Sequence, residues 1–169
     1  MNINSTRVTA CLLALAIVLH AHGANVRCTP RSLSPSAVKS EVRRLSEVLR
    51  KGSVDARSVA LYDLACLGAS AEPAVPLMIE SFAARNGELQ GLAIDAVAAI
   101  GVPAVPHLIR ALESSNVNIR GNACSALGAI GAPAKAALPA LAKLAVGAPG
   151  TTGQAEIAIA KIVCRKSQR

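Results

Sequence analysis

The stretch from Arg120 to Gly131, RGNACSALGAIG, carries the pattern that decides the fold. Two earlier stretches repeat it: RSVALYDLACLG from Arg57 to Gly68, and QGLAIDAVAAIG from Gln90 to Gly101. In each stretch, apolar residues recur at steps of three beside a small alanine, which predicts a helix with one apolar side. The aligned columns are Ala60/Ala93/Ala123, Leu61/Ile94/Cys124, Leu64/Val97/Leu127 and Leu67/Ile100/Ile130. Each stretch ends at a glycine, which predicts a left-handed helix cap.

A second apolar helix is predicted after each glycine, beyond a short turn that contains proline. Pro76, Pro106 and Pro139 open these helices, where the missing amide proton of proline costs nothing. Apolar residues then recur at steps of three and four, which predicts a second apolar stripe. The aligned sets are Val75/Val105/Leu138, Met78/Leu108/Leu141, Ile79/Ile109/Ala142 and Phe82/Leu112/Ala145. Each repeat is therefore predicted to be a helical hairpin.

The third repeat carries a motif that resembles the HEAT-like repeat, in the short variety also seen in phycobilin lyase subunits. The residues that match are Arg120, Ala123, Ala126, Leu127, Gly128, Ile130 and Gly131, followed by Pro139. The resemblance covers residues 36–163 and implies an all-α solenoid of about three helical hairpins with half-repeat caps. Residues 36–51 and 154–163 are the caps, since Thr152 and Val163 replace the expected arginine and glycine. Stacking is required because one hairpin cannot bury both of its stripes.

The N-terminal residues 1–23 have the layout of a signal peptide. Arg7 precedes an uncharged apolar run from Val8 to Leu19, and the small Ala21 and Gly23 fit cleavage after Gly23. A membrane span needs about 20 apolar residues, so cleavage and export to the periplasm or the medium are favoured. An uncleaved membrane anchor is the alternative. The remaining chain divides into an extended segment (24–35), the repeat domain (36–163) and a basic tail (164–169).

Composition and charge exclude several classes of function. The chain is 52% hydrophobic and 17% charged, which predicts a folded core. Aromatic residues make up 1%, which leaves little for sugar platforms or base stacking. The formal net charge is +8, but the cations gather in residues 27–51 and 161–169, at the two ends of the domain. No basic groove runs through the repeats, so a nucleic-acid partner is not expected.

No constellation of catalytic or metal-binding residues is found. His107 is the one histidine left once the leader is removed, and no Cys-x-x-Cys motif or His-Glu pair is present. Asp63 and Asp95 have no matching carboxylate in the third repeat. A nucleophile would have to be Cys66 or Cys124, and both lie at apolar positions that favour a buried structural thiol. We therefore predict no enzyme activity, no metal site and no cofactor.

Four cysteines remain in the predicted mature chain, namely Cys28, Cys66, Cys124 and Cys164. An even number in an oxidising compartment permits disulfides. The sequence leaves their oxidation state open. One hypothesis is a bridge between Cys28 and Cys164, with Cys66 and Cys124 as buried thiols.

The second helices also carry residues that face away from their apolar stripe. Leu77, His107 and Ala140 occupy one column, and Glu80, Arg110 and Lys143 occupy the next. A solvated helix face has the same appearance. The functional interpretation is a partner-binding patch of Leu77, Glu80, His107, Arg110 and Lys143 on the concave side.

We expect a monomeric, non-catalytic protein-protein interaction scaffold that acts outside the cytoplasm, has no membrane span after cleavage and binds an unidentified protein. The lyase resemblance implies the alternative, an accessory subunit that holds a substrate protein or chromophore. The third possibility is a structural fragment of a longer array.

Overall fold

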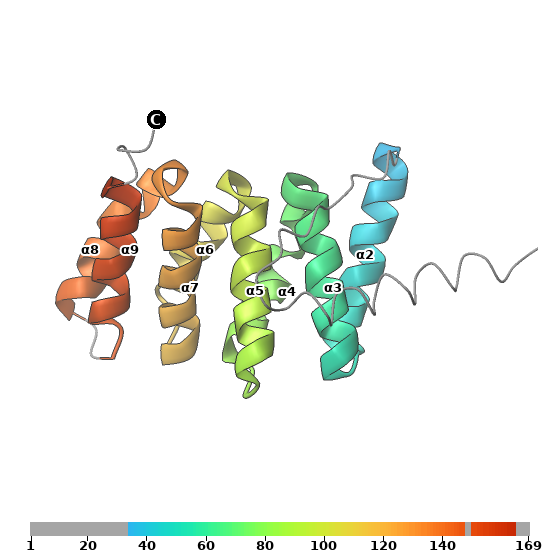
Figure 1. Cartoon of the computed structure of the whole chain (residues 1–169), viewed down its shortest axis with the longest axis horizontal. Helices are drawn as coiled ribbons and strands as arrows, with labels where there is room; N and C mark the ends of the chain where they lie inside the picture. The colour runs from blue at the N-terminus through green and yellow to red at the C-terminus, as the bar shows by residue number, and fades with distance from the viewer. Residues whose placement is uncertain (1–33, 148–149, 165–169) are drawn as a thin grey trace, which may run out of the picture.

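The computed structural model describes residues 34–147 and 150–164, which form two layers of helices (Figure 1). One layer holds α3 (Val54–Leu67), α5 (Gly87–Ile100), α7 (Val117–Ile130) and α9 (Thr152–Cys164). The other layer holds α4 (Val75–Glu80), α6 (Val105–Ala111) and α8 (Leu138–Gly147), and α2 (Pro35–Lys51) packs against α3 and α4 at one end. Short 3-10 segments join the layers: η1 (Gly68–Ala74), η2 (Ser81–Ala83), η3 (Val102–Ala104) and η4 (Ala132–Ala137). The predicted all-α solenoid of helical hairpins is confirmed.

The first helices stack closely because small residues line their contacts. Helix α3 packs on α5, α5 on α7 and α7 on α9. The alanine column Ala60, Ala93 and Ala123 is almost fully buried. At Gly128 a Cβ atom would lie 3.3 Å from the Cα atom of Ala158, so this glycine allows α9 to approach α7. The repeat phase is therefore confirmed, since the positions predicted to face the core are buried or half-buried in both layers, with one exception. Ala142 was predicted in the apolar stripe of α8 but is exposed, because Leu141 and Leu144 are the residues of that helix that face the core.

Each first helix begins three residues before the repeated stretch, where a polar side chain caps it. Ser53, Asn86 and Asn116 each accept a hydrogen bond from a backbone N–H in the first turn of α3, α5 and α7. The Asn86 Oδ1 atom, for example, lies 3.0 Å from the backbone nitrogen of Leu89. Such caps satisfy amide groups that have no partner inside the helix. They explain why the helices are longer than the apolar pattern indicated.

The residue that opens each repeated stretch ties its helix to a neighbouring loop. Arg57 Nη2 donates to Ser81 Oγ over 3.1 Å, and Gln90 Nε2 donates to the carbonyl of Ala84 over 2.6 Å. Arg120 Nη1 donates to the carbonyls of Ser114 and Ser115 over 2.9 and 3.0 Å. The arginine of the repeat motif therefore has a structural role in holding the loop between hairpins.

The glycines that end the first helices have a conformation that differs from the expected cap. Gly68, Gly101 and Gly131 have φ values of 53°, 76° and 73°, so positive φ is confirmed. Their ψ values of −135°, −136° and −141° place them in the mirror image of the β region and not in the left-handed helical region. This conformation is open to glycine and turns the chain directly into the next 3-10 segment.

We expect Gly101→Ala to lower the free energy of unfolding by about 1 to 3 kcal/mol, because alanine is strained at this φ and ψ. The loss would come from the backbone alone, since a Cβ at this position meets no atom within 4 Å. The matched control is Gly91→Ala inside α5, where a Cβ also meets nothing and the backbone is helical. That change is expected to add about 0.5 to 1 kcal/mol. Urea denaturation followed by circular dichroism measures both, and equal effects would contradict the prediction.

Several sequence predictions concern the ends and one connection. The glycines and Pro149 of residues 147–153 predict a linker. In the structure α8 continues to Gly147 and α9 already begins at Thr152, after a buried Thr151. The predicted signal peptide, the segment 24–33 and residues 165–169 of the tail lie outside the described residues. Among the described residues no single helix is long and apolar enough to cross a membrane, and α5 meets that test only together with η3 and α6, across a bend of 113°.

Candidate functional site

The five residues of the predicted partner-binding patch lie on three successive second helices. Leu77 and Glu80 lie on α4, His107 and Arg110 on α6, and Lys143 on α8. They occupy equivalent positions relative to Pro76, Pro106 and Pro139, which are the second residues of their helices. Glu80, Arg110 and Lys143 are exposed, whereas Leu77 and His107 are half-buried. The residues of the patch thus occupy the same positions on each second helix, and the position of Glu80, Arg110 and Lys143 is exposed to solvent.

A chain of hydrogen bonds joins part of this patch to the preceding repeat. The Nε2 atom of His107 lies 2.9 Å from Oε1 of Glu72 in η1. The Nη2 atom of Arg110 lies 3.1 Å from Nδ1 of His107. The His107 side chain is 18% exposed and that of Glu72 is 46% exposed. The three residues therefore connect η1 of the first hairpin to α6 of the second at the surface.

The two partners of His107 define its tautomer in the neutral state. Arginine can only donate, so Nδ1 must accept from Arg110, and the ring proton must then lie on Nε2 and point at Glu72. The His107 ring thus holds the guanidinium of Arg110 in place.

Glu72 was missed in the sequence analysis because it lies in the turn before α4 and not on a second helix. The equivalent positions, four residues before Pro106 and Pro139, are Val102 and Lys135, so no repeated column marks it. Its contact with His107 spans 35 positions of the chain. The one sign of Glu72 in the sequence is that an acidic residue lies in the longer first turn, and such a residue does not by itself indicate a contact with His107.

A groove beside Leu77 extends the surface onto α2. The groove has a volume of about 690 Å³ and runs between α2 on one side and η1 and α4 on the other. Its apolar lining includes Val38 and Val42 of α2, Pro73 of η1, and Leu77. Lys39, Arg43, Glu47 and Arg50 also line it. The sequence predicts this helix only as a cap, so the predicted patch does not include α2.

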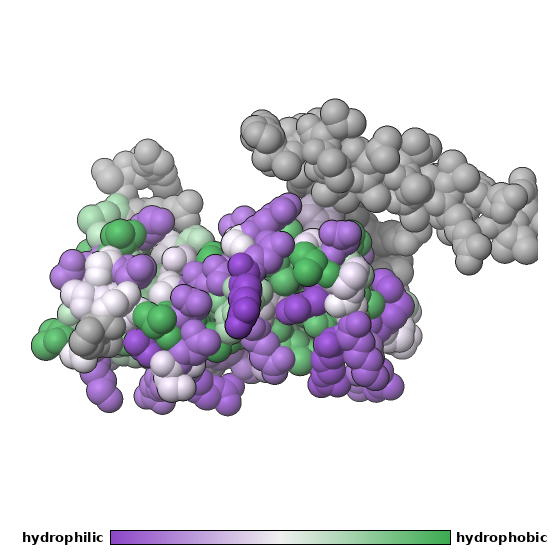
Figure 2. Space-filling model, turned by 90° about the horizontal axis from the view of Figure 1, so that it is seen from below, coloured by the Kyte–Doolittle hydropathy of each residue, from purple (hydrophilic) through white to green (hydrophobic). Residues whose placement is uncertain are grey.

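Some charged side chains of α2 form ion pairs with described residues, and others do not. Glu41 accepts from Arg44, and Glu47 accepts from Arg50 over 2.9 Å and lies 3.4 Å from Lys51. Lys51 and Arg50 hold the pKa of the Glu47 carboxyl below its usual range. Lys39 and Arg43 form no ion pair or hydrogen bond with any residue that the structure describes. The groove therefore carries unpaired positive charge on its α2 side, and hydrophilic residues gather at this end of the stack, on the right of Figure 2.

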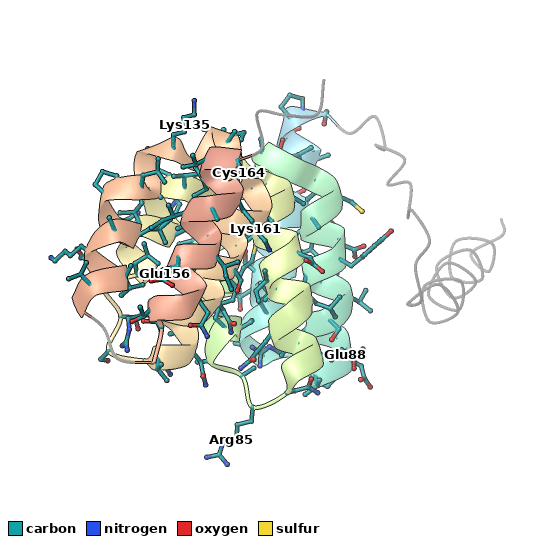
Figure 3. All side chains as sticks on the ribbon, turned by 60° about the vertical axis from the view of Figure 1, so that its left-hand side comes forward. Arg85, Glu88, Lys135, Glu156, Lys161 and Cys164 are labelled. Carbon is teal, nitrogen blue, oxygen red and sulfur yellow. The ribbon has the colours of Figure 1, made fainter. Side chains whose placement is uncertain are left out.

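The structure corrects the hypothesis on cysteine pairing. Cys164 is a free and exposed thiol at the end of α9 (Figure 3), so a bridge from Cys28 to Cys164 is wrong. Cys66 is half-buried and disulfide-bonded, and is not the buried free thiol that its apolar position indicated. The other half of its bridge lies outside the described residues. Cys124 is a buried free thiol, as expected.

Cys124 and Cys164 are expected to differ in reactivity. Burial raises the pKa of the Cys124 thiol to about 11, so it is protonated and shielded at neutral pH. The thiolate is the reactive form. We expect N-ethylmaleimide to modify Cys164 in the folded protein near neutral pH and to reach Cys124 only after denaturation, as read by peptide mass spectrometry. Equal modification of both thiols in the folded protein would show that the α7 core is open.

The described residues bring together no group suited to hold a metal ion. No group of three or more His, Cys, Asp and Glu residues in residues 34–147 and 150–164 is placed to hold a metal ion. Asp63 is half-buried, and this burial raises the pKa of its carboxyl, whereas Asp95 is exposed. Cys124, with its raised pKa, does not have the properties of an activated nucleophile.

Comparison with known proteins agrees with this architecture. Residues 74–160 match the family described as HEAT repeats. No curated protein matches the chain. A solved structure of an engineered protein is similar, with 19% sequence identity and a TM-score of 0.43, over 76% of this chain and 67% of the other.

Proposed function

The chain belongs to the HEAT-repeat family, whose members generally mediate protein-protein interaction, and we propose that it is a non-catalytic protein-binding scaffold that acts outside the cytoplasm. The family is generally non-catalytic as well. The observation that carries the proposal is the row of exposed charges at equivalent positions of α4, α6 and α8, namely Glu80, Arg110 and Lys143. A row of this kind offers a partner several contacts on one rigid stack.

The hydrogen bonds around His107 make α6 the centre of this surface. Arg110 is exposed, but its guanidinium contacts a half-buried ring that is hydrogen-bonded to Glu72 of the preceding repeat. A side chain that is already oriented loses less conformational entropy when a partner binds it. Arg110 is also suited to a carboxylate on the partner, since its fork can donate two parallel hydrogen bonds.

Two features support a place outside the cytoplasm. The first is the signal-peptide layout of residues 1–23, with Arg7 before an apolar run. The second is the disulfide at Cys66, because disulfides persist in oxidising compartments and are rare in the cytosol. Cell fractionation of the full chain, with the N-terminus of the product read by mass spectrometry, tests this part. A product that retains residues 1–23 in the membrane fraction would support the uncleaved anchor instead.

The binding surface is tested by placing a photo-crosslinking amino acid at Leu77 in the full chain, inside the cell that expresses it. We expect one dominant crosslinked protein, which is lost when Arg110→Glu and Lys143→Glu are combined. The control is Arg85→Glu, which makes one such charge reversal at an exposed arginine that points away from the stack (Figure 3). A crosslink that survives the double reversal would contradict the proposed surface. Co-purification of a coloured chromophore would support the lyase-type alternative.

A further inference from the structure

The geometry points to a docking groove between α2 and the η1–α4 segment that binds an acidic, leucine-bearing segment of the partner protein. This inference rests on the proposed function. The groove is lined by apolar side chains of both walls, with Leu77 contributed by the predicted patch. Cations line its α2 side. A partner that fits must supply apolar side chains for the floor and carboxylates for the rim.

The shape of the groove favours a peptide segment over a compact ligand. Its lining residues on α2 run from Pro35 to Arg50, over most of the length of that helix. At 1.5 Å per residue this distance is about 22 Å, which matches an extended segment of about seven residues. The opposite wall is formed by Ser70, Pro73 and Leu77. An elongated apolar floor of this kind is typical of sites that bind a segment of another chain.

Charge identifies which segment fits. Lys39, Arg43 and Arg50 line the groove, against the single carboxylate Glu47, which is already paired with Arg50 and Lys51. The free cations, Lys39 and Arg43, are exposed, so they are available to a partner without breaking an ion pair within the described residues. Complementary charge at the rim of an interface raises the rate of association and sets specificity.

Charge also excludes two segments of this chain, residues 24–33 and 165–169, as occupants of the groove. Residues 24–33 carry Arg27 and Arg31 and no acid, and residues 165–169 carry three cations and no acid. Either segment would place positive charge against Lys39 and Arg43. The occupant is therefore a segment of a different protein, rich in Asp or Glu.

The test is fluorescence anisotropy with the full chain and two labelled peptides. One peptide has three leucines separated by pairs of glutamate, and the other has lysine in place of each glutamate. We expect the acidic peptide to bind and the basic one not to bind. Lys39→Glu combined with Arg43→Glu should weaken binding at least about tenfold, since two surface attractions become repulsions. Added salt should weaken binding to the wild-type protein as well.

Arg85→Glu is again the control, and it should leave the affinity for the acidic peptide unchanged. Equal binding of both peptides, or no effect of the double reversal, would overturn the groove as an acidic docking site. So would the absence of peptide binding, including the case in which the protein binds phosphatidylglycerol vesicles instead.

If the acidic peptide does not bind while the crosslink at Leu77 still depends on Arg110 and Lys143, the groove proposal is wrong and the proposed function stands. If the peptide binds but no crosslink depends on Arg110 and Lys143, the groove stands without the rest of the surface.

Discussion

Phe82→Ala is expected to lower the free energy of unfolding by about 3 to 5 kcal/mol, the usual cost of removing a buried ring. Phe82 is fully buried and is the largest such side chain among the described residues. It lies in η2, which contacts α4, α5 and α7. Its carbonyl accepts a hydrogen bond from Asn122 Nδ2 of α7 over 3.0 Å. The cavity would therefore open where the first and third repeats meet.

Urea denaturation followed by circular dichroism measures this loss. Phe82→Leu is the matched variant, since it keeps most of the apolar volume and the backbone contact with Asn122, and it should lose clearly less. A loss of less than about 1 kcal/mol for Phe82→Ala would mean that η2 does not pack between these helices.

Leu127→Ala is expected to lower the free energy of unfolding by about 2 to 5 kcal/mol, and Ile100→Ala should fall in the same range. Leu127 is fully buried and Ile100 is 3% exposed. Both occupy columns that recur in every repeat, so each deletion removes contacts with its own hairpin and with the neighbouring one. A domain of this size has about 5 to 15 kcal/mol of stability in total, so either change is a large fraction of it.

Val117→Ala is the control for Leu127, because it truncates an apolar side chain on the same helix that is 44% exposed. Its effect should stay within about 0.5 kcal/mol. If Leu127→Ala and Val117→Ala lost the same stability, the assignment of the buried side of α7 would be wrong.

The helix positions of the predicted partner-binding patch could be read from the primary sequence. The register of Glu80, Arg110 and Lys143 followed from the spacing to Pro76, Pro106 and Pro139, because spacing along a helix determines which side a residue occupies. The contact of Glu72 with His107 and the groove on α2 could not be predicted. Both depend on how far one hairpin is shifted and rotated against the next, and the repeat pattern carries no measure of that rotation.

The pairing of cysteines shows the same division. The apolar column of Cys124 correctly placed this residue in the core. The apolar surroundings of Cys66 in the sequence indicated a buried free thiol, but Cys66 is half-buried and disulfide-bonded. A column reports the side of a helix and says nothing of which other chain segment lies over it. Disulfide pairing requires the Cα atoms of two cysteines to come within about 7 Å, and that distance is set in space.

Local patterns thus established the helical hairpins, their phase and the positive φ of Gly68, Gly101 and Gly131. These features depend on residues within one or two helical turns, where periodicity and backbone sterics act directly. The packing of α2 against α4 and the contact between Glu72 and His107 arise from the placement of one hairpin against its neighbour. The exposure of Lys39 and Arg43 depends on the same placement. They are properties of the stacked array, because each follows from the relative placement of elements that the chain brings together only when it folds.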